Sequence, residues 1–199
     1  MMKVLFTLAA LCITMIVQAQ EKGHAEYKKA HQAYQAEKFE EARKEYLKAA
    51  TQGHVAAMYS LGYMYENGQG VDPDYSEAIH WYRKAIAGGH IDAMIGLGIM
   101  YQNNDTHLEA ENCFRLAAEK NDENGMFLLG YNYYQREMFD EAFRWFTSSA
   151  KKGHADAMFH VAEMYSNGLG TTADEQKSTD WYRKAAEKGH REAIEKLNE

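Results

Sequence analysis

Proline is almost absent from this 199-residue sequence, in which Pro73 is the single example. Because proline fixes φ and interrupts helices, so low a content suits a helical chain better than a loop-rich one. Hydrophobic residues make up 46% and charged residues 26% of the chain, which is the composition of an ordinary soluble domain. The length is sufficient for one such domain.

Cysteine is nearly as rare, with Cys12 near the N-terminus and Cys113 in the body of the chain. Removal of an N-terminal leader would leave Cys113 alone, and a single cysteine cannot form a disulfide within the chain. The fold is therefore expected to depend on packing. Whether Cys113 forms a disulfide with another chain is left open.

The sequence lacks any concentrated run of Lys and Arg, and its net charge is −7. Phosphate backbones and anionic lipid surfaces are bound mainly by clustered positive charge. Nucleic acid and anionic membrane surfaces are therefore not expected as partners.

No hydrophobic run reaches the ~20 residues that a membrane-spanning helix needs. An apolar stretch at residues 4–17 follows "MMK" and precedes "QAQ", which predicts a secretory signal peptide over residues 1–19. An uncleaved anchor is the alternative. Cleavage would remove Lys3, change the net charge from −7 to −8 and leave no membrane insertion. The protein is thus expected to be exported, to the periplasm or beyond.

What the sequence does contain is a repeat. "NGQGVDPDYSEAIHWYRKAIAGGH" at 67–90 is answered by "NGLGTTADEQKSTDWYRKAAEKGH" at 167–190, an offset of 100. "AMYSLGYMY" from Ala57 likewise returns as "AMIGLGIMY", "GMFLLGYNY" and "AMFHVAEMY". A fixed period indicates stacked structural units. We predict a repeat domain over 20–199, with units near 21–52, 53–88, 89–120, 121–152 and 153–188 and a cap at 189–199.

Each unit contains two segments with apolar residues at helical spacing, as in Met58, Leu61 and Tyr65. The connection carries Gly and Asp in the longer units, and the Gly of each "GH" stands where a left-handed helix C-cap favours glycine. The predicted fold is all-α: a right-handed superhelical solenoid of about five helix-turn-helix repeats plus a C-terminal capping helix. Gly62, Gly98 and Gly130 are expected to face Ala78, Ala110 and Ala142 across each hairpin, so that Gly98→Leu would overpack the seam.

The stretch "LGYMYENGQGVDPDYSEAIHWYRKAIAGGH" resembles the Sel-one-like repeat (SLR), a relative of the tetratricopeptide repeat. The resemblance covers essentially residues 21–199 and is most specific in the second and fifth units. It implies an α/α solenoid that serves as a scaffold for protein partners, without catalytic apparatus. One exported branch of the family pins its repeats with disulfides, and this sequence lacks those cysteines.

Residues that could carry chemistry are interpreted as structural. His54, His90, His154 and His190 share one slot, and equivalent slots lie on the order of 10 Å apart, whereas zinc ligands lie ~2 Å from one ion. They are expected to be polar residues that start the next helix. The "GQG" and "GLG" loops lack the strand and the Lys of a phosphate loop. Cys113 occupies the slot of Trp81 and is expected to be buried. We predict no metal, no cofactor and no catalytic residue.

A superhelix of this kind turns the positions flanking the Leu-Gly pair toward its concave face. Two residues before the Leu position stand Tyr27, Tyr59, Ile95, Phe127 and Phe159; two residues after it stand His31, Tyr63, Ile99, Tyr131 and Glu163. Large apolar side chains on such a face indicate a partner site. The earlier position could equally serve packing between repeats, so Tyr63, Ile99 and Tyr131 are the stronger candidates. The predicted partner-binding residues are Tyr59, Tyr63, Ile95, Ile99, Phe127, Tyr131, Phe159 and Glu163.

The sequence therefore predicts an exported, non-catalytic scaffold that binds an unidentified protein or peptide along its concave face. Two alternatives stay open. One is a cell-envelope enzyme or glycan-binding protein that stacks its aromatic side chains on sugars, although no acid/base pair or nucleophile can be identified. The other is a structural homo-oligomer whose concave face packs on itself.

Overall fold

A computed structural model describes residues 23–198, and this part of the chain contains helices and no strand. The predicted signal peptide lies outside the described residues. Residues 23–35 are helical and are followed by ten further helices. These are α2 (Phe39–Thr51), α3 (Val55–Asn67), α4 (Tyr75–Ala87), α5 (Ile91–Asn103), α6 (His107–Glu119), α7 (Glu123–Gln135), α8 (Phe139–Lys152), α9 (Ala155–Asn167), α10 (Glu175–Glu187) and α11 (Arg191–Leu197). No helix among residues 23–198 is long and apolar enough to cross a membrane.

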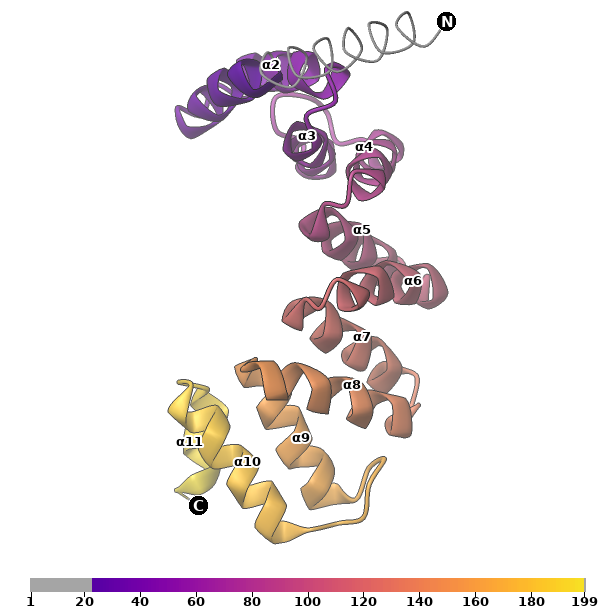
Figure 1. Ribbon diagram of the computed structural model, residues 1–199, viewed down its shortest axis with the longest axis vertical. Helices are drawn as coiled ribbons and strands as arrows, with labels where there is room; N and C mark the ends of the chain where they lie inside the picture. Colours follow the sequence, from indigo (N-terminus) through magenta and orange to yellow (C-terminus); the bar gives the residue numbers. More distant parts are fainter. Residues whose placement is uncertain (1–22, 199) are drawn as a thin grey trace, which may run out of the picture. The chain divides into compact units, whose positions relative to one another are not determined.

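The chain divides after Gly96 into two compact units, and each has its own buried core. In the first unit the core includes Tyr46, Leu61 and Met64, which are almost completely buried. In the second unit the core includes Phe114, Leu129 and Phe146, which are completely buried. Within the second unit, Figure 1 shows α9 and α10 lying side by side and joined by a long loop, which is the helix hairpin that the repeat predicts.

The two units follow the same register at the offset of 100. Helices α2, α3, α4 and α5 begin at residues 39, 55, 75 and 91, and α8, α9, α10 and α11 begin at 139, 155, 175 and 191. Helical residues 23–35 correspond in the same way to α7 at 123–135. The last helix, α11, is the short capping helix expected after Gly189. Equivalent positions in the two units can therefore be compared residue by residue.

The "GH" pairs between hairpins end one helix and begin the next. Gly53, Gly89, Gly153 and Gly189 all have positive φ, between +84° and +108°, which glycine adopts without steric cost. The imidazole of His54 then accepts a hydrogen bond from the backbone N–H of Ala57, and His154 and His190 make the equivalent bond to the third residue after them. The prediction that these histidines start helices is confirmed for all three.

The long "GQG" loop between α3 and α4 lies against the preceding hairpin. Gly70 has φ +69°, and a Cβ there would lie 2.4 Å from the backbone carbonyl carbon of Phe39. Its carbonyl oxygen accepts a hydrogen bond from Nε of Arg43 at 3.2 Å. In the second unit Gly170 meets the backbone of Phe139 in the same way. The second glycine of the loop is thus required both by its conformation and by close approach.

The seam within each hairpin corrects a detail of the sequence-based prediction. A Cβ on Gly62 would meet the ring of Tyr82 at 2.6 Å, and one on Gly98 would meet Phe114 at 2.5 Å. Gly130 faces the ring of Phe146 at 2.8 Å. The expected neighbours Ala78, Ala110 and Ala142 are buried, but the nearest atoms belong to aromatic rings one helical turn further on. The glycines make room for rings rather than for alanines.

A charged network joins α6 to α7 in the second unit. The Glu111 carboxylate accepts hydrogen bonds from Arg115 at 2.7 Å, from Arg136 at 2.6 Å and from the Tyr133 hydroxyl at 2.8 Å. Burial opposes ionisation of Glu111, but these three donors outweigh it and lower the pKa of the carboxyl below its ordinary value. Cys113, two residues further along the same helix, is buried as expected.

Candidate functional site

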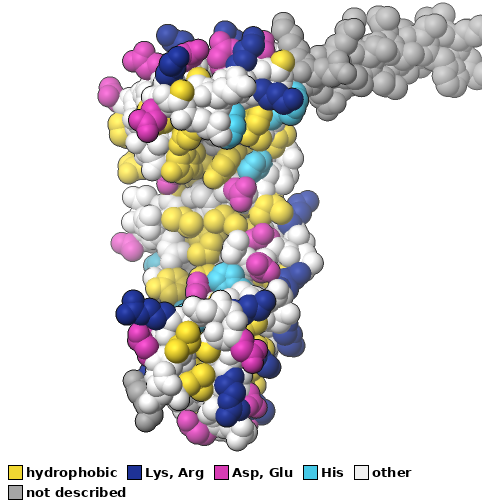
Figure 2. Space-filling model, turned by 90° about the vertical axis from the view of Figure 1, so that its left-hand side faces the viewer, with side chains coloured by type: hydrophobic (Ala, Val, Ile, Leu, Met, Phe, Trp, Pro, Cys, Tyr) yellow, Lys and Arg dark blue, Asp and Glu magenta, His cyan; other side chains and the backbone are white. Residues whose placement is uncertain are grey.

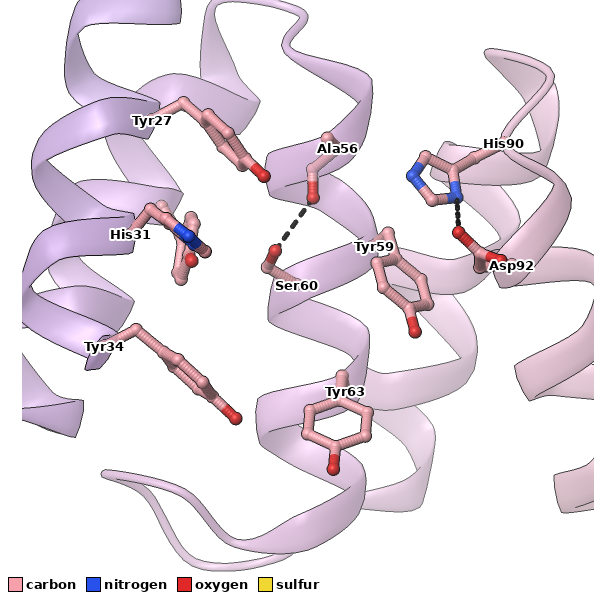
Figure 3. Close-up of a pocket in the computed structure, with 10 residues that line it drawn as sticks. Tyr27, His31, Tyr34, Ala56, Tyr59, Ser60, Tyr63, His90 and Asp92 are labelled. Carbon is pink, nitrogen blue, oxygen red and sulfur yellow. Dashed lines mark hydrogen bonds and ion pairs between the residues drawn. The ribbon is translucent and has the colours of Figure 1, made fainter. Parts of the chain in front are cut away.

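A pocket of about 360 Å³ lies in the first unit, among the helices that begin successive hairpins. Helical residues 23–35, α2, α3 and the start of α5 all contribute to its wall. Figure 3 shows Ser60 on α3 in the middle of the pocket, with Tyr27 and Tyr34 on one side and Tyr59 on the other. The lining residues are Tyr27, His31, Tyr34, Tyr46, Ala56, Tyr59, Ser60, Tyr63, His90 and Asp92.

Several pocket side chains are held in place by contacts with neighbouring side chains. The ring of Tyr27 stacks on His54 with centroids 4.3 Å apart, and that of Tyr59 stacks on His90 at 4.6 Å. The Tyr34 hydroxyl donates a hydrogen bond to the side chain of Gln69 at 2.8 Å. Because these contacts fix the rings in advance, a ligand entering the pocket would have little side-chain entropy to offset.

Asp92 contributes a carboxylate to the pocket, and no Lys or Arg is among the lining residues. The Asp92 carboxylate is 3.9 Å from Nδ1 of His90, and its side chain is 69% exposed. Burial lowers the pKa of His90, which favours the neutral imidazole even though Asp92 acts in the opposite direction. Burial, with a further contribution from the Asp92 charge, raises the pKa of Tyr59, and burial raises that of Tyr46 to about 12. The hydroxyls of Tyr46 and Tyr59 therefore stay protonated, and these side chains act as hydrogen-bonding groups and ring surfaces.

The pocket brings together two of the predicted partner-binding residues, Tyr59 and Tyr63. Tyr63 is 39% exposed, so its ring is available to a partner. Ile95 and Ile99 lie further along on α5, outside the lining of this pocket, where Ile95 is half-buried and Ile99 is 38% exposed. On the face drawn in Figure 2, hydrophobic and histidine side chains gather over the first unit, and charged side chains of both signs lie at the top of the view.

In the second unit the predicted residues take part in internal contacts. Phe127 and Tyr131 lie 5.8 and 6.1 Å from the ring of His160, measured between centroids. Phe159 stacks on His190 at 4.5 Å. Glu163 accepts a hydrogen bond from the Tyr182 hydroxyl. Tyr131 and Glu163 are half-buried, so this unit offers less aromatic surface than the first.

The aromatic residues two positions before the Leu are explained by packing between repeats. In four hairpins such a ring stacks on the histidine that precedes the next helix, within 4.3 to 4.6 Å and 13° to 18° of parallel; the pairs are Tyr27–His54, Tyr59–His90, Phe127–His154 and Phe159–His190. The third hairpin replaces both partners, with Ile95 in the ring position and Asp122 as the cap. The ring and the imidazole thus occur together or not at all.

Sequence reasoning missed several residues of the pocket. The positions that flank the Leu-Gly pair do not include Tyr34 or Tyr46, although both line the pocket and belong to the tyrosine-rich first unit. The repeat pattern predicts His90 only as the start of a helix and gives no signal for Asp92. These residues reach the pocket because neighbouring helices pack close to the Leu-Gly positions. Helical periodicity within one segment does not reveal such packing between helices.

No group of three or more His, Cys, Asp or Glu side chains among residues 23–198 is arranged to hold a metal ion. The histidine rings of the pocket instead serve as stacking surfaces. What the site offers chemically is a set of ring faces, phenol hydroxyls and one carboxylate, which is a recognition surface.

Proteins of similar sequence and structure contain the same kind of helical repeat. The protective antigen c5321 of uropathogenic Escherichia coli, which displays an SLR fold, is 30% identical with a TM-score of 0.79, over 89% of this chain and 42% of that one. A Sel1 repeat protein from Oxalobacter formigenes is 31% identical with a TM-score of 0.68, over 78% and 65% of the two chains. An uncharacterised protein of Neisseria meningitidis, NMB1327, is 28% identical over 80% of this chain.

The chain spans 35% of the length of the Neisseria relative and less than half of the E. coli antigen. The Sel1 repeat pattern itself matches residues 38–54, 55–90, 91–122, 124–154 and 155–190. These matches cover most of the sequence and agree with the helix hairpins of both units. The protein belongs to the Sel1 repeat family.

Proposed function

We propose that this protein is an exported scaffold that binds a segment of another protein through the pocket of its first unit. Sel1 repeats are interaction scaffolds as a class, and the pocket lies on the helices that the family is expected to present on its concave face. The observation that carries the proposal is the pocket itself: pre-positioned tyrosine rings around Ser60, with Tyr63 exposed beside them.

The chemistry of the pocket suits a peptide segment. Tyrosines combine a large ring surface with a hydroxyl and lose little side-chain entropy on binding, which is why they are enriched at protein interfaces. A pocket of about 360 Å³ accommodates one side chain and the adjoining backbone rather than a folded domain. Specificity would then come from the residues that differ between repeats.

Crosslinking in living cells tests this proposal. A photoreactive phenylalanine analogue replaces Tyr63, and the matched control replaces Tyr75, a tyrosine of the same unit that is 59% exposed and outside the pocket. We expect a discrete protein adduct from position 63 that is missing from position 75. Recovery of glycan alone would favour the glycan-binding alternative, and recovery of the protein itself would favour self-assembly. Either result contradicts the proposal.

Export is the second part of the proposal, and it rests on the sequence of residues 1–19. Mass spectrometry of the purified protein from fractionated cells should find a chain that begins at Gln20 in the envelope fraction or the medium. A chain that retains residues 1–19 and stays in the cytoplasm would contradict export.

A further inference from the structure

The second unit contains a counterpart of the pocket at the offset of 100, and in that counterpart a side chain of the protein fills the central position. Ser60 corresponds to His160, and the pocket rings Tyr27, Tyr34 and Tyr46 correspond to Phe127, Tyr134 and Phe146. Aromatic rings therefore surround the same place in both units. Serine leaves the place open in the first unit, whereas histidine occupies it in the second.

The imidazole of His160 shows what such a place accepts. Its ring stacks on Phe146 with centroids 4.8 Å apart and planes within 10° of parallel. Tyr131 and Tyr134 each lie 6.1 Å away, and Phe159 meets the ring edge-on at 5.9 Å. A flat, nitrogen-containing group is thus sandwiched among aromatic side chains. The ring that stacks on it, Phe146, is the counterpart of Tyr46 in the first unit.

Charge decides which flat group suits the open pocket. Asp92 lies in the wall with most of its side chain exposed, and no Lys or Arg is among the lining residues. Glu66, on the same helix as Tyr63, lies outside the lining and accepts a hydrogen bond from the Tyr82 hydroxyl at 2.5 Å, but its negative charge also acts electrostatically on Tyr59. A cation is therefore favoured over an anion. Tyrosine ring faces also attract cations through their quadrupole.

We propose that the pocket of the first unit binds an arginine side chain of a partner peptide, inserted over Ser60 among the tyrosine rings as His160 is inserted in the second unit. Guanidinium is flat, stacks on aromatic rings, is weakly hydrated and pairs with carboxylates such as Asp92. Lysine offers the charge without the flat surface. This inference rests on the proposed function, because it specifies the segment that the scaffold binds.

Titration with short peptides tests the inference on the purified protein. The probes are the acetylated and amidated pentapeptides Ser-Gly-Xaa-Gly-Ser, where Xaa is arginine or its neutral, flat analogue citrulline. Binding is followed by NMR of protein labelled with carbon-13 at the tyrosine rings. We expect saturable shifts of pocket tyrosines with the arginine peptide and about tenfold weaker binding of the citrulline peptide, the size of a partly desolvated cation–ring interaction. Equal affinity for the two peptides would overturn the proposal.

Two variants locate the binding. Ser60→His places in the first unit the ring that fills the second, and it should weaken binding of the arginine peptide at least tenfold. Its control, Ser76→His, adds the same ring on an exposed position of α4 outside the pocket and should bind as the parent does. Asp92→Asn keeps the volume and should weaken arginine binding while leaving citrulline binding unchanged. This second variant keeps the test valid if Ser60→His melts early.

The outcomes separate this inference from the proposed function. If the partner crosslinked at Tyr63 is not competed by the arginine peptide, the arginine assignment is wrong and the scaffold remains. If a folded Ser60→His variant binds the arginine peptide as the parent does, the pocket is not where arginine binds. If the arginine peptide binds as expected but no protein is crosslinked in cells, the assignment to a partner peptide fails and the site binds small guanidinium compounds instead.

Discussion

The close approach of Gly98 to Phe114 gives the most direct test of the helix register. A Cβ at residue 98 would lie 2.5 and 2.7 Å from two ring carbons of Phe114, closer than real Cβ contacts come. Phe114 is completely buried, so a shift of its ring would disturb the side chains packed around it. Gly98→Ala should therefore destabilise the protein even though alanine is the better helix former.

Gly96 on the same helix provides the matched control. A Cβ there would lie 3.3 Å from the far end of the Tyr82 ring, which a small movement can relieve. Replacing glycine by alanine within a helix gains up to about 1 kcal/mol of propensity. Because both substitutions are in α5, this gain cancels in the difference between the two variants. What remains is the overpacking cost at residue 98, about 1–3 kcal/mol.

Thermal unfolding followed by circular dichroism measures that difference. For a chain of this size 1 kcal/mol corresponds to about 2–4 °C in Tm. We expect Gly96→Ala to melt close to the parent and Gly98→Ala to melt clearly below both. Gly98→Leu should be worse than Gly98→Ala, since it adds three carbons to the same clash. If Gly98→Ala melts with or above Gly96→Ala, the Phe114 ring does not lie against residue 98 and the register of α5 on α6 is wrong.

Three further predictions follow from contacts described above. Gly70→Ala should lower the free energy of unfolding by about 1–3 kcal/mol more than Gly89→Ala does. Both glycines have positive φ, but only Gly70 lies against the backbone of Phe39. Equal melting temperatures for the two variants would contradict the packing of the loop on the preceding hairpin. Glu111→Gln should lower the Tm at pH 7, and the difference in Tm from the parent should narrow as the pH falls below about 4.5. The reason is that a carboxyl group whose pKa is lowered by folding contributes stability that is lost as the pH falls through its folded pKa. A difference in Tm independent of pH would refute the role of the ionised network. His154→Asn keeps a capping side chain but removes the ring that stacks on Phe127, so it should lower the Tm near pH 8. The difference in Tm from the parent should shrink as the pH falls below 6.5, because burial lowers the pKa of His154 and its stabilising neutral form is lost in acid. A difference in Tm that does not change with pH would show that the stack contributes nothing.

Much of the fold could be predicted from the sequence because equivalent residues recur at fixed offsets, which shows where each helix of a repeat begins and ends. The recurring "GH" predicted where helices end and begin, and Gly53 and His54 do so by a left-handed cap and a side-chain hydrogen bond. The seam was assigned less well. Ala78 and Tyr82 are one turn apart on the same face of α4, so periodicity alone could not say which of them covers Gly62. The Tyr82 ring is the larger side chain and extends over Gly62, and the spacing of residues along a helix does not show how far a side chain extends.

The site was predicted only in part for a similar reason. Tyr59 and Tyr63 follow from their spacing around the Leu-Gly pair, since both lie on one face of one helix. Tyr46 and Asp92 come from other hairpins and reach the pocket only because the helices pack as they do. The alternative interpretation of the earlier position, packing between repeats, is the one that the stacked histidines support. Tyr59 nevertheless does both, with one contact to His90 and one surface on the pocket.

The internal repeat also shows which differences matter for binding. Stacking pairs such as Tyr59–His90 and Phe159–His190 recur in both units, as a structural device should. Residue 60 does not follow this rule, because serine and histidine differ in volume and sit at the centre of a ring cluster. A purely structural role would favour filling both clusters, since an open cavity forfeits packing energy. In the first unit the cluster around Ser60 stays open beside the exposed Tyr63 and the carboxylate of Asp92. Binding of a flat cation from a partner would fill the cluster and supply the missing packing contacts.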